Sequence, residues 1–221
     1  MIRTFDLLIS VILLACLSPL MLLIMFLLKF TGEREIFFYQ QRIGKNYKKF
    51  KLIKFATMLK NSPNIGNRTI TLLNDPRILP LGNFLRKTKI NELPQLFNVI
   101  KNDMSLIGPR PLTIELFNQY SPSIKKKISK LKPGLSGVGS IVFRTEEKML
   151  KKRKNIKSFY KKIILPYKGS LEVWYYKNSK PSIYFFLIFL TIVSIFFPKS
   201  FFLENFMRVL PKPPRKLAIY F

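Results

Sequence analysis

The feature that most constrains this chain is an apolar segment near its N-terminus, Phe5 to Leu28, which reads FDLLISVILLACLSPLMLLIMFLL. Its polar residues are Asp6, Ser10 and Ser18. A helix rises about 1.5 Å per residue, so this segment is long enough to cross a hydrocarbon core of about 30 Å. The sequence therefore predicts a membrane-attached helix here.

Ser18 and Pro19 lie just past the centre of this segment. Proline removes a backbone donor and clashes with the carbonyl four residues earlier, so the helix should kink here, and the serine hydroxyl can satisfy the freed carbonyl. A kink at mid-depth permits a re-entrant hairpin that enters and leaves the membrane by one face. A single-span anchor is the alternative. No small-x-small site follows the apolar core, which argues against a cleaved signal peptide.

Positive charge flanks the segment on both sides, so the positive-inside rule does not favour placing its two ends on opposite faces of a membrane. Both ends are compatible with the cytoplasmic face. The flanking cations are Arg3 before the segment and Lys29, Arg34, Arg42 and Lys45 after it.

A second apolar run extends from Ser182 to Phe197, between Pro181 and Pro198. As a helix it reaches about 24 Å, which is short of a hydrocarbon core of about 30 Å. It should therefore lie in or dip into the membrane interface, or pack against protein.

The charge balance removes much of catalytic chemistry. The 221 residues include 39 Lys and Arg against 11 Asp and Glu, a net charge of +28, and no histidine. This excludes Ser-His and Cys-His nucleophile pairs, and the lone Cys16 forms neither a zinc cluster nor an internal disulfide. Catalysis must rest on few carboxylates and many cations. The charge implies a polyanionic partner, namely nucleic acid, a phosphorylated substrate or an anionic membrane.

Local patterns predict a small sheet and several helices. Residues 36–55 indicate two short strands joined by a turn at 44–46, because β-branched and aromatic clusters flank a Gly/Asn break. Residues 61–69, NSPNIGNRT, are typical of a loop, and 79–89 of a helix. The basic stretch 123–162 is interpreted as a solvated face or a membrane-surface contact.

The most patterned segment is 91–100, NELPQLFNVI, where an apolar helical face of Leu93, Leu96, Phe97 and Ile100 is predicted from the i, i+3, i+4, i+7 spacing. Pro94 is tolerated only in a first turn and asparagine is a favoured N-cap, so a helix should begin at residue 91. The following residue, 92, then lies in the first turn, where the dipole favours an ionised glutamate suited to ligate a metal.

Three arginines are candidates for binding phosphate. Arg110 stands between two prolines in IGPRP, which limits its freedom and suits bidentate capture of a phosphate. Arg86 precedes the predicted helix start at Asn91, and Arg144 follows a glycine-rich turn at 132–137. A surface arginine in a proline-rich turn is the plainer interpretation of Arg110.

Together these segments resemble a family. The stretch 85–112, LRKTKINELPQLFNVIKNDMSLIGPRPL, is similar to the core motif of the bacterial sugar transferases, which are monotopic polyprenyl-phosphate phosphoglycosyl transferases. That motif is an arginine, then Asp-Glu-Leu-Pro-Gln, then Gly-Asp-Met-Ser-x-x-Gly-Pro-Arg-Pro. The Ser-Pro hairpin, 37–58, 132–137 and 171–178 follow in the expected order, so the resemblance covers nearly the whole chain.

The resemblance implies an α+β, mostly helical, compact membrane-associated domain, with an N-terminal re-entrant helical hairpin broken at Ser-Pro and interfacial helices. We expect a re-entrant membrane helix at 1–30, a cytoplasmic catalytic domain at 31–180, and a C-terminal membrane-interfacial segment with a basic tail at 181–221. Such proteins sit on the cytoplasmic face of the inner membrane, where anionic lipids are further partners; a homodimer is left open, and no nucleic acid is expected.

The resemblance also implies a reaction. Members transfer a sugar 1-phosphate from a UDP-sugar to undecaprenyl phosphate, release UMP and begin a surface glycan such as a capsule, exopolysaccharide or O-antigen. The aspartate of the Asp-Glu pair attacks the sugar-linked phosphate, and the glutamate helps to bind Mg²⁺. Carried over by position, Glu92 matches that glutamate, and Arg86, Arg110 and Arg144 match family arginines. Glu172 stands where aspartate is common.

This chain departs from the motif at the nucleophile, where it has Asn91, whose amide cannot act as a carboxylate nucleophile. Three alternatives follow: Glu92 becomes the nucleophile, the transfer proceeds differently with Asn91 positioning a phosphate, or the protein is an inactive scaffold. Smaller departures are Asn102, Ser140 and Ala56. A rival class is a basic membrane or nucleic-acid-binding protein without catalysis.

Overall fold

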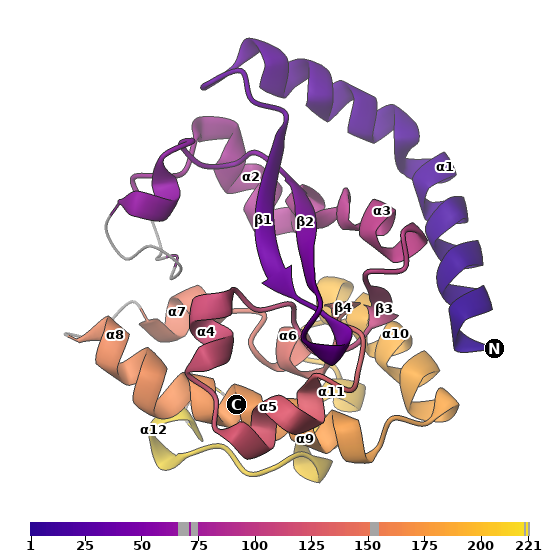
Figure 1. The fold of residues 1–221 in the computed structure, drawn as a ribbon, viewed down its shortest axis with the longest axis vertical. Helices are drawn as coiled ribbons and strands as arrows, with labels where there is room; N and C mark the ends of the chain where they lie inside the picture. The colour runs from indigo at the N-terminus through magenta and orange to yellow at the C-terminus, as the bar shows by residue number, and fades with distance from the viewer. Residues whose placement is uncertain (66–70, 72–74, 151–154, 219, 221) are drawn as a thin grey trace.

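A computed structural model describes residues 1–221 except 66–70, 72–74, 151–154, 219 and 221. The described chain is mostly helical, with two small sheets (Figure 1). The strands are β1 (Phe37–Ile43), β2 (Lys49–Phe55), β3 (Ser105–Ile107) and β4 (Gly134–Ser136). The α-helices are α1 (Ile2–Phe30), α2 (Pro80–Thr88), α3 (Gln95–Ile100), α4 (Ile114–Asn118), α5 (Pro122–Ile128), α6 (Val138–Val142), α7 (Glu146–Leu150), α8 (Ile156–Phe159), α9 (Leu165–Lys177), α10 (Pro181–Phe196), α11 (Phe201–Val209) and α12 (Arg215–Ala218).

Helix α1 contains the apolar N-terminal segment and is long and apolar enough to cross a membrane. Only 17% of its most apolar stretch of 18 residues is buried. Pro19 lies inside the helix without ending it, and the ribbon bends along its length (Figure 1). The Ser18 hydroxyl donates to the carbonyl of Ala15 at 2.8 Å. Proline has no N–H, so Pro19 cannot donate to this carbonyl as another residue would. The prediction that the serine hydroxyl satisfies the freed carbonyl is confirmed. The helix is unbroken at Ser-Pro in this structure, and a re-entrant path through a bilayer stays a prediction.

The start of α1 is fastened to the rest of the chain through polar contacts. Asp6, 2% exposed, accepts hydrogen bonds from the Ser105 hydroxyl at 2.9 Å, the Leu106 amide at 2.8 Å and the Tyr184 hydroxyl at 2.5 Å. Arg3 donates to the carbonyls at the end of α3. One buried carboxylate thus joins α1 to β3 and α10.

Replacing the Asp6 carboxylate should weaken the contacts of α1 with β3 and α10. We expect Asp6→Asn to lower the free energy of unfolding by about 2 kcal/mol, because the amide loses the charge and one acceptor while three donors remain buried around it. Thermal unfolding of the detergent-solubilised chain measures this. Asp103→Asn, at a half-buried carboxylate whose contact is a 3.4 Å bond from Asn98, is the control and should shift the midpoint little. Equal shifts in the two variants would contradict the role of Asp6.

The predicted pair of strands at 36–55 is confirmed. Strands β1 and β2 are antiparallel, with Phe37 opposite Phe55 and Ile43 opposite Lys49. The turn between them contains a short 3₁₀ segment, Lys45–Tyr47, in which Asn46 has a φ of 53°, a left-handed conformation that asparagine tolerates. The predicted loop at 61–69 falls partly outside the described residues; within them, Ser62–Asn64 forms a 3₁₀ turn.

The glycine-rich segment 132–137 was expected to be a turn, but Gly134–Ser136 forms strand β4, parallel to β3. The two backbones approach so closely that a Cβ on Gly134 would lie 2.0 Å from the amide nitrogen of Gly108. Glycine is therefore required at residue 134 by backbone contact. This pairing places the segment that leads to Arg110 beside the segment that leads to α6.

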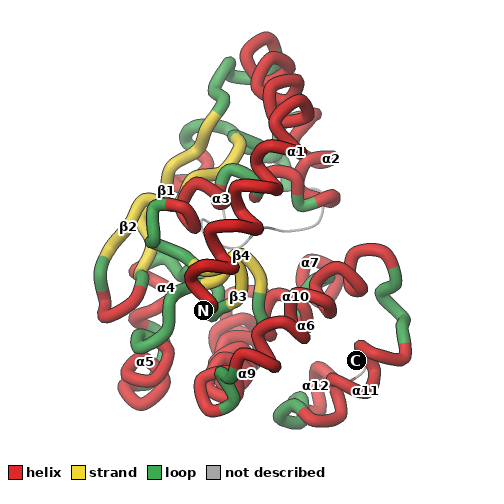
Figure 2. Tube along the Cα trace, turned by 90° about the vertical axis from the view of Figure 1, so that its right-hand side faces the viewer, coloured by secondary structure: helices red, strands yellow, loops and turns green. Residues whose placement is uncertain are grey.

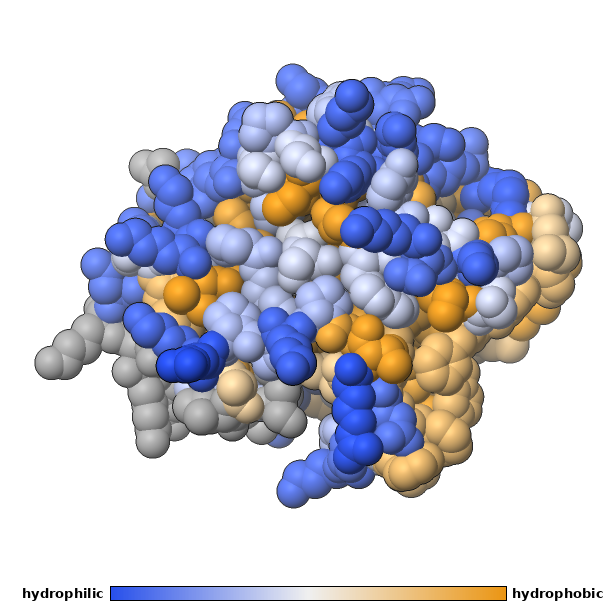
Figure 3. All heavy atoms as spheres, turned by 90° about the horizontal axis from the view of Figure 1, so that it is seen from below, coloured by the Kyte–Doolittle hydropathy of each residue, from blue (hydrophilic) through white to orange (hydrophobic). Residues whose placement is uncertain are grey.

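The second apolar run forms α10, as predicted. One stripe of this helix, Tyr184, Leu187 and Leu190, is buried in the main apolar core, while Phe185 and Phe189 on another stripe are 36% and 42% exposed. Figure 2 shows β1 and β2 on one side of the molecule and α10, α11 and α12 on the other. Viewed from below, apolar side chains gather along one edge while hydrophilic ones cover much of the rest of that face (Figure 3).

Candidate functional site

The predicted catalytic and phosphate-binding residues line one cavity of about 1580 Å³. Its charged part is built from several elements: β1 and β2, the end of α2 with the turn that follows it, the loop after β3, α7 with the segment before it, and α9. That part includes Arg42, Lys54, Arg86, Lys89, Asn91, Glu92, Arg110, Arg144, Glu146, Glu147 and Lys168. Ser18 and Pro19 are not among the described residues that line it.

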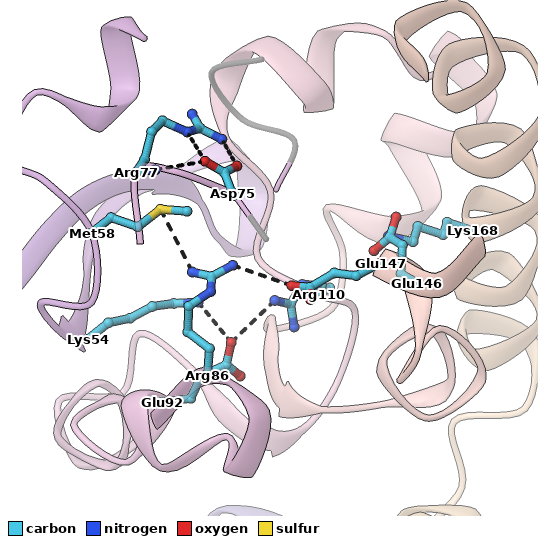
Figure 4. Close-up of polar contacts among 10 residues, drawn as sticks. All are labelled: Lys54, Met58, Asp75, Arg77, Arg86, Glu92, Arg110, Glu146, Glu147 and Lys168. Carbon is cyan, nitrogen blue, oxygen red and sulfur yellow. Dashed lines mark hydrogen bonds and ion pairs between the residues drawn. The ribbon is translucent and has the colours of Figure 1, made fainter. Parts of the chain in front are cut away.

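Glu92 stands among cations in this cavity. Its Oε1 accepts from Lys54 Nζ at 2.9 Å and from Arg110 Nη2 at 3.3 Å, and its side chain is 13% exposed (Figure 4). Burial alone would raise the pKa of Glu92, but the positive charges of Lys54, Arg110 and Lys89 outweigh it and hold the pKa well below its usual range. Glu92 is therefore ionised at neutral pH.

The turn that presents Glu92 differs from the predicted one. Lys89 ends α2 in the left-handed region with a φ of 64°, and a 3₁₀ turn, Ile90–Glu92, follows at once. Helix α3 begins only at Gln95, with Pro94 at its N-cap position. The prediction that Asn91 caps the helix is thus wrong, as is the placement of Glu92 in its first α-helical turn. The neighbouring cations, rather than a helix dipole, stabilise its charge.

The predicted apolar face of this segment is also partly wrong. Leu96 is 1% exposed, as expected, but Phe97 is 42% exposed and Val99 is fully buried instead. Helix α3 packs against α1 and β2. Strands β3 and β4 also contact α3, so the helix has neighbours on more than one side and its burial does not follow a single stripe.

Asn91 is buried, 5% exposed, and its Oδ1 has no hydrogen-bond partner among the described residues. An unpartnered buried acceptor is costly and is often explained by an ion or ligand. The oxygen belongs to the residue beside Glu92 and lines the same cavity. Asn91 thus offers a second oxygen ligand at the predicted site.

The three predicted arginines line the same cavity, but they do not contact the same residue. Arg110 reaches Glu92, whereas Arg86 Nη2 lies 3.7 Å from Glu147 Oε1 (Figure 4). Burial lowers the pKa of Arg86 and of Arg144, because a charged guanidinium loses solvation. A cavity lined by desolvated cations favours a ligand that carries several negative charges.

Sequence reasoning missed several members of the site. Lys54 pairs with Glu92, and burial lowers its pKa to about 8 despite the carboxylate. Lys168, 8% exposed, lies 2.7 Å from Glu146 Oε2 and donates to Tyr160 at 3.4 Å. Tyr160 begins a π-helical segment, Tyr160–Ile164, a feature common at functional sites. Lysines are so frequent in this chain that no sequence signal distinguishes these two.

Glu172, where the resemblance expects an aspartate, lies behind Arg110. It is 4% exposed, its Oε1 accepts from the Arg110 amide at 3.3 Å, and its Oε2 has no partner among the described residues. A Cβ on Gly139 would lie 2.5 Å from that Oε1, so the carboxyl is tightly enclosed. Burial raises the pKa of Glu172 to about 7.

This shift predicts a pH dependence of stability. Between pH 4.5 and about 7 the folded chain holds a proton on Glu172 that the unfolded chain has released. The free energy of unfolding should therefore fall as the pH rises through this window, by about 3 kcal/mol at most. Glu172→Gln should flatten that slope in denaturant unfolding at pH 5 and pH 8, while the exposed Glu115→Gln should leave it unchanged. A slope that persists in Glu172→Gln would contradict the assignment.

Known proteins match the part of the chain that contains this cavity. A family model described as "Bacterial sugar transferase" matches residues 1–198. The exopolysaccharide production protein ExoY of Sinorhizobium fredii is 37% identical over 158 residues, covering 65% of this chain and 70% of that protein. The undecaprenyl-phosphate galactose phosphotransferase of Salmonella typhimurium is 35% identical over 158 residues, covering 65% of this chain and 33% of that protein.

A third relative is the UDP-N-acetylgalactosamine-undecaprenyl-phosphate N-acetylgalactosaminephosphotransferase of Aeromonas hydrophila, 38% identical over 142 residues, or 63% of this chain and 33% of that protein. The chain thus spans about a third of the length of the Salmonella and Aeromonas proteins, but most of ExoY. The matched family segment contains the charged part of the cavity described above.

Proposed function

The chain belongs to the bacterial sugar transferase family, and from that premise we propose that it transfers a sugar 1-phosphate from a UDP-sugar to undecaprenyl phosphate. The reaction releases UMP at the cytoplasmic face of the inner membrane and begins a surface glycan. The observation that carries this proposal is the ionised Glu92 held by Lys54 and Arg110 in a cavity lined with further cations.

The electrostatics of the cavity suit attack on a diphosphate. Negative charge grows on the leaving phosphate as a phosphorus–oxygen bond breaks, and fixed cations in a partly desolvated site stabilise it. Arg86, Arg110 and Arg144 are the residues proposed to hold the substrate phosphates. Arginine can neutralise phosphate charge without help from histidine, and this chain has no histidine.

Mg²⁺ is the cofactor that the family resemblance implies, and the residues present fit it. The described residues hold no group of three acidic, histidine or cysteine side chains that would form an all-protein cage. Mg²⁺ is, however, commonly bound through one or two protein oxygens together with substrate phosphates and waters. Glu92 and the unpartnered Oδ1 of Asn91 would hold it here. When bound, the ion neutralises charge on the phosphate oxygens.

The route of transfer must do without an aspartate at residue 91. Both cationic contacts of Glu92 fall on its Oε1 and hold its pKa low, which weakens it as a nucleophile. We therefore propose a single displacement. An oxygen of undecaprenyl phosphate bonds to the phosphorus that carries the sugar, the bond from that phosphorus to the bridging oxygen breaks, and UMP leaves with the electron pair. Asn91 and Arg110 hold the reacting phosphates in place.

The membrane attachment is proposed from the exposed apolar surfaces. Helix α1, within the proposed membrane segment 1–30, would enter one leaflet and return at Ser18 and Pro19. The segment 181–221 would lie at the interface through Phe185 and Phe189 of α10 and Phe201 and Phe202 of α11, which are all exposed. Residues 31–180 would form the cytoplasmic catalytic domain. This arrangement would place the site at headgroup height, where a polyprenyl phosphate presents its phosphate.

The direct test is an assay of UMP release. Detergent-solubilised chain is incubated with Mg²⁺, undecaprenyl phosphate and a panel of UDP-sugars, and we expect UMP to appear with at least one sugar and only in the presence of the acceptor. UMP release without acceptor would contradict the single displacement. No UMP from a broad panel would contradict the transferase activity and favour the scaffold alternative.

A further inference from the structure

The Lys168 ammonium is a buried cation in the cavity that the chemistry above leaves unused. Lys168 lines the same cavity as Arg144, and its Nζ lies 2.8 and 2.7 Å from the two carboxylate oxygens of Glu146 (Figure 4). Nζ also donates to the Tyr160 hydroxyl at 3.4 Å. Burial alone would lower the pKa of Lys168, but its interactions with Glu146 and Tyr160 outweigh burial and raise the pKa. Lys168 is therefore charged at neutral pH.

The ammonium of Lys168 also contacts an aromatic ring a few residues before Glu146. Nζ lies 4.9 Å from the ring centroid of Phe143, which is a cation–π contact. Tyr167, the residue before Lys168 in α9, packs edge to face against the same ring with centroids 5.8 Å apart. Helix α9 thus holds both the ring of Phe143 and the carboxylate of Glu146.

Phe143 and Glu146 are the two ends of the turn that presents Arg144. The Glu146 amide donates to the Phe143 carbonyl at 3.1 Å, which closes the turn, and α7 begins at Glu146. The Arg144 side chain makes no ion pair or hydrogen bond with the residues that the structure describes. The place of its guanidinium in the cavity therefore depends on how the turn is held, and Lys168 contacts both ends of that turn.

From this arrangement we infer that Lys168 is a positioning residue, which holds Arg144 in place to bind a phosphate of the UDP-sugar. The inference rests on the proposed function, in which Arg144 binds a substrate phosphate. Lys168 acts without touching the substrate, because its ammonium is already surrounded by Glu146, Tyr160 and Phe143. Without that ammonium the turn loses the contact shared by its two ends, and Arg144 gains conformational freedom that it must give up on binding.

The test measures the affinity of the full chain in detergent for UDP with Mg²⁺, by isothermal titration calorimetry. UDP carries the two phosphates of the donor but no sugar, so the result does not depend on which sugar is transferred. We expect Lys168→Met to weaken binding about tenfold, and Glu146→Met to weaken it by a similar factor, because both remove the same contact. Lys177→Met and Glu204→Met are matched controls, since both residues are exposed and neither lines the cavity. The controls should bind UDP like the wild type.

The two variants change the charge of the cavity in opposite directions, which separates positioning from direct attraction. Coulomb attraction alone predicts that loss of the Glu146 carboxylate strengthens the binding of an anion, whereas loss of the Lys168 ammonium weakens it. Positioning predicts that both variants bind UDP more weakly. Tighter binding by Glu146→Met would overturn the inference, as would wild-type affinity in Lys168→Met. If thermal unfolding shows that Lys168→Met does not fold, the direction of the Glu146→Met effect decides.

A double variant tests whether the effect passes through Arg144. Arg144→Met should itself weaken UDP binding, and adding Lys168→Met should cause less than about twofold further loss, because the residue to be positioned is already gone. A combined loss equal to the product of the two single losses would overturn the inference.

Binding of UDP needs no turnover, so the measurement also distinguishes this inference from the proposed function. A wild type that binds UDP and shows the expected losses in its variants, but releases no UMP, would contradict the transferase proposal alone. A wild type that does not bind UDP would contradict both.

Discussion

Glu92→Gln should reduce UMP release at least about a thousandfold, because it removes the charge on which the cationic site is centred while keeping the shape of the side chain. The amide would leave Lys54 and Arg110 without their carboxylate partner in a cavity where desolvation is already costly. The measurement is single-turnover release of UMP with the best UDP-sugar from the panel, together with thermal unfolding to show that the variant is folded.

Glu147→Gln is the matched control for this prediction. Glu147 lines the same cavity, but it is 43% exposed at its side chain and its ion pair with Arg86 is 3.7 Å long. Exposed pairs of this length contribute little, so the rate should fall by less than about tenfold. A Glu92→Gln variant that released UMP at the wild-type rate would show that the glutamate is neither a ligand nor a nucleophile. The proposal for this site would then fail.

Asn91→Asp should have the second largest effect, in the opposite direction. It restores the carboxylate of the family motif at a buried position next to Glu92, whose charge is stabilised by Lys54, Arg110 and Lys89, and so supplies a nucleophile that the wild type lacks. We expect UMP release to rise about a hundredfold and to occur without acceptor. Intact mass measurement after incubation with UDP-sugar alone should show a phosphosugar adduct on the variant and none on the wild type.

Asn91→Ala separates two roles of the native residue. If the amide positions a phosphate or an ion, this variant should lose rate; if Asn91 only fills space, it should not. A wild type that is silent while Asn91→Asp is active would identify the native chain as a scaffold. An adduct on the wild type would instead assign covalent catalysis to Glu92 and contradict the single displacement.

Local structure was predictable where residue chemistry decides it. The two strands at 36–55 were predicted from a Gly/Asn break between aromatic clusters, and the bond from Ser18 to the Ala15 carbonyl from the missing donor of Pro19. The residue at which the helix after Glu92 begins was not predictable in the same way. Lys89 adopts a left-handed conformation that nothing in its side chain requires, and the 3₁₀ turn that follows displaces Asn91 from the capping position.

The sequence by itself determined which groups are available: no histidine, few carboxylates, many cations, and an apolar N-terminal segment long enough to cross a membrane. Only the tertiary structure decided which of them interact. Lys54 and Arg110 lie 38 and 18 positions from Glu92 in the chain, and Tyr184 lies 178 positions from Asp6, yet each pair is in contact. Coulomb attraction and desolvation depend on distance in space and on burial, so the charge state of Glu92 is set by residues that its own segment does not contain.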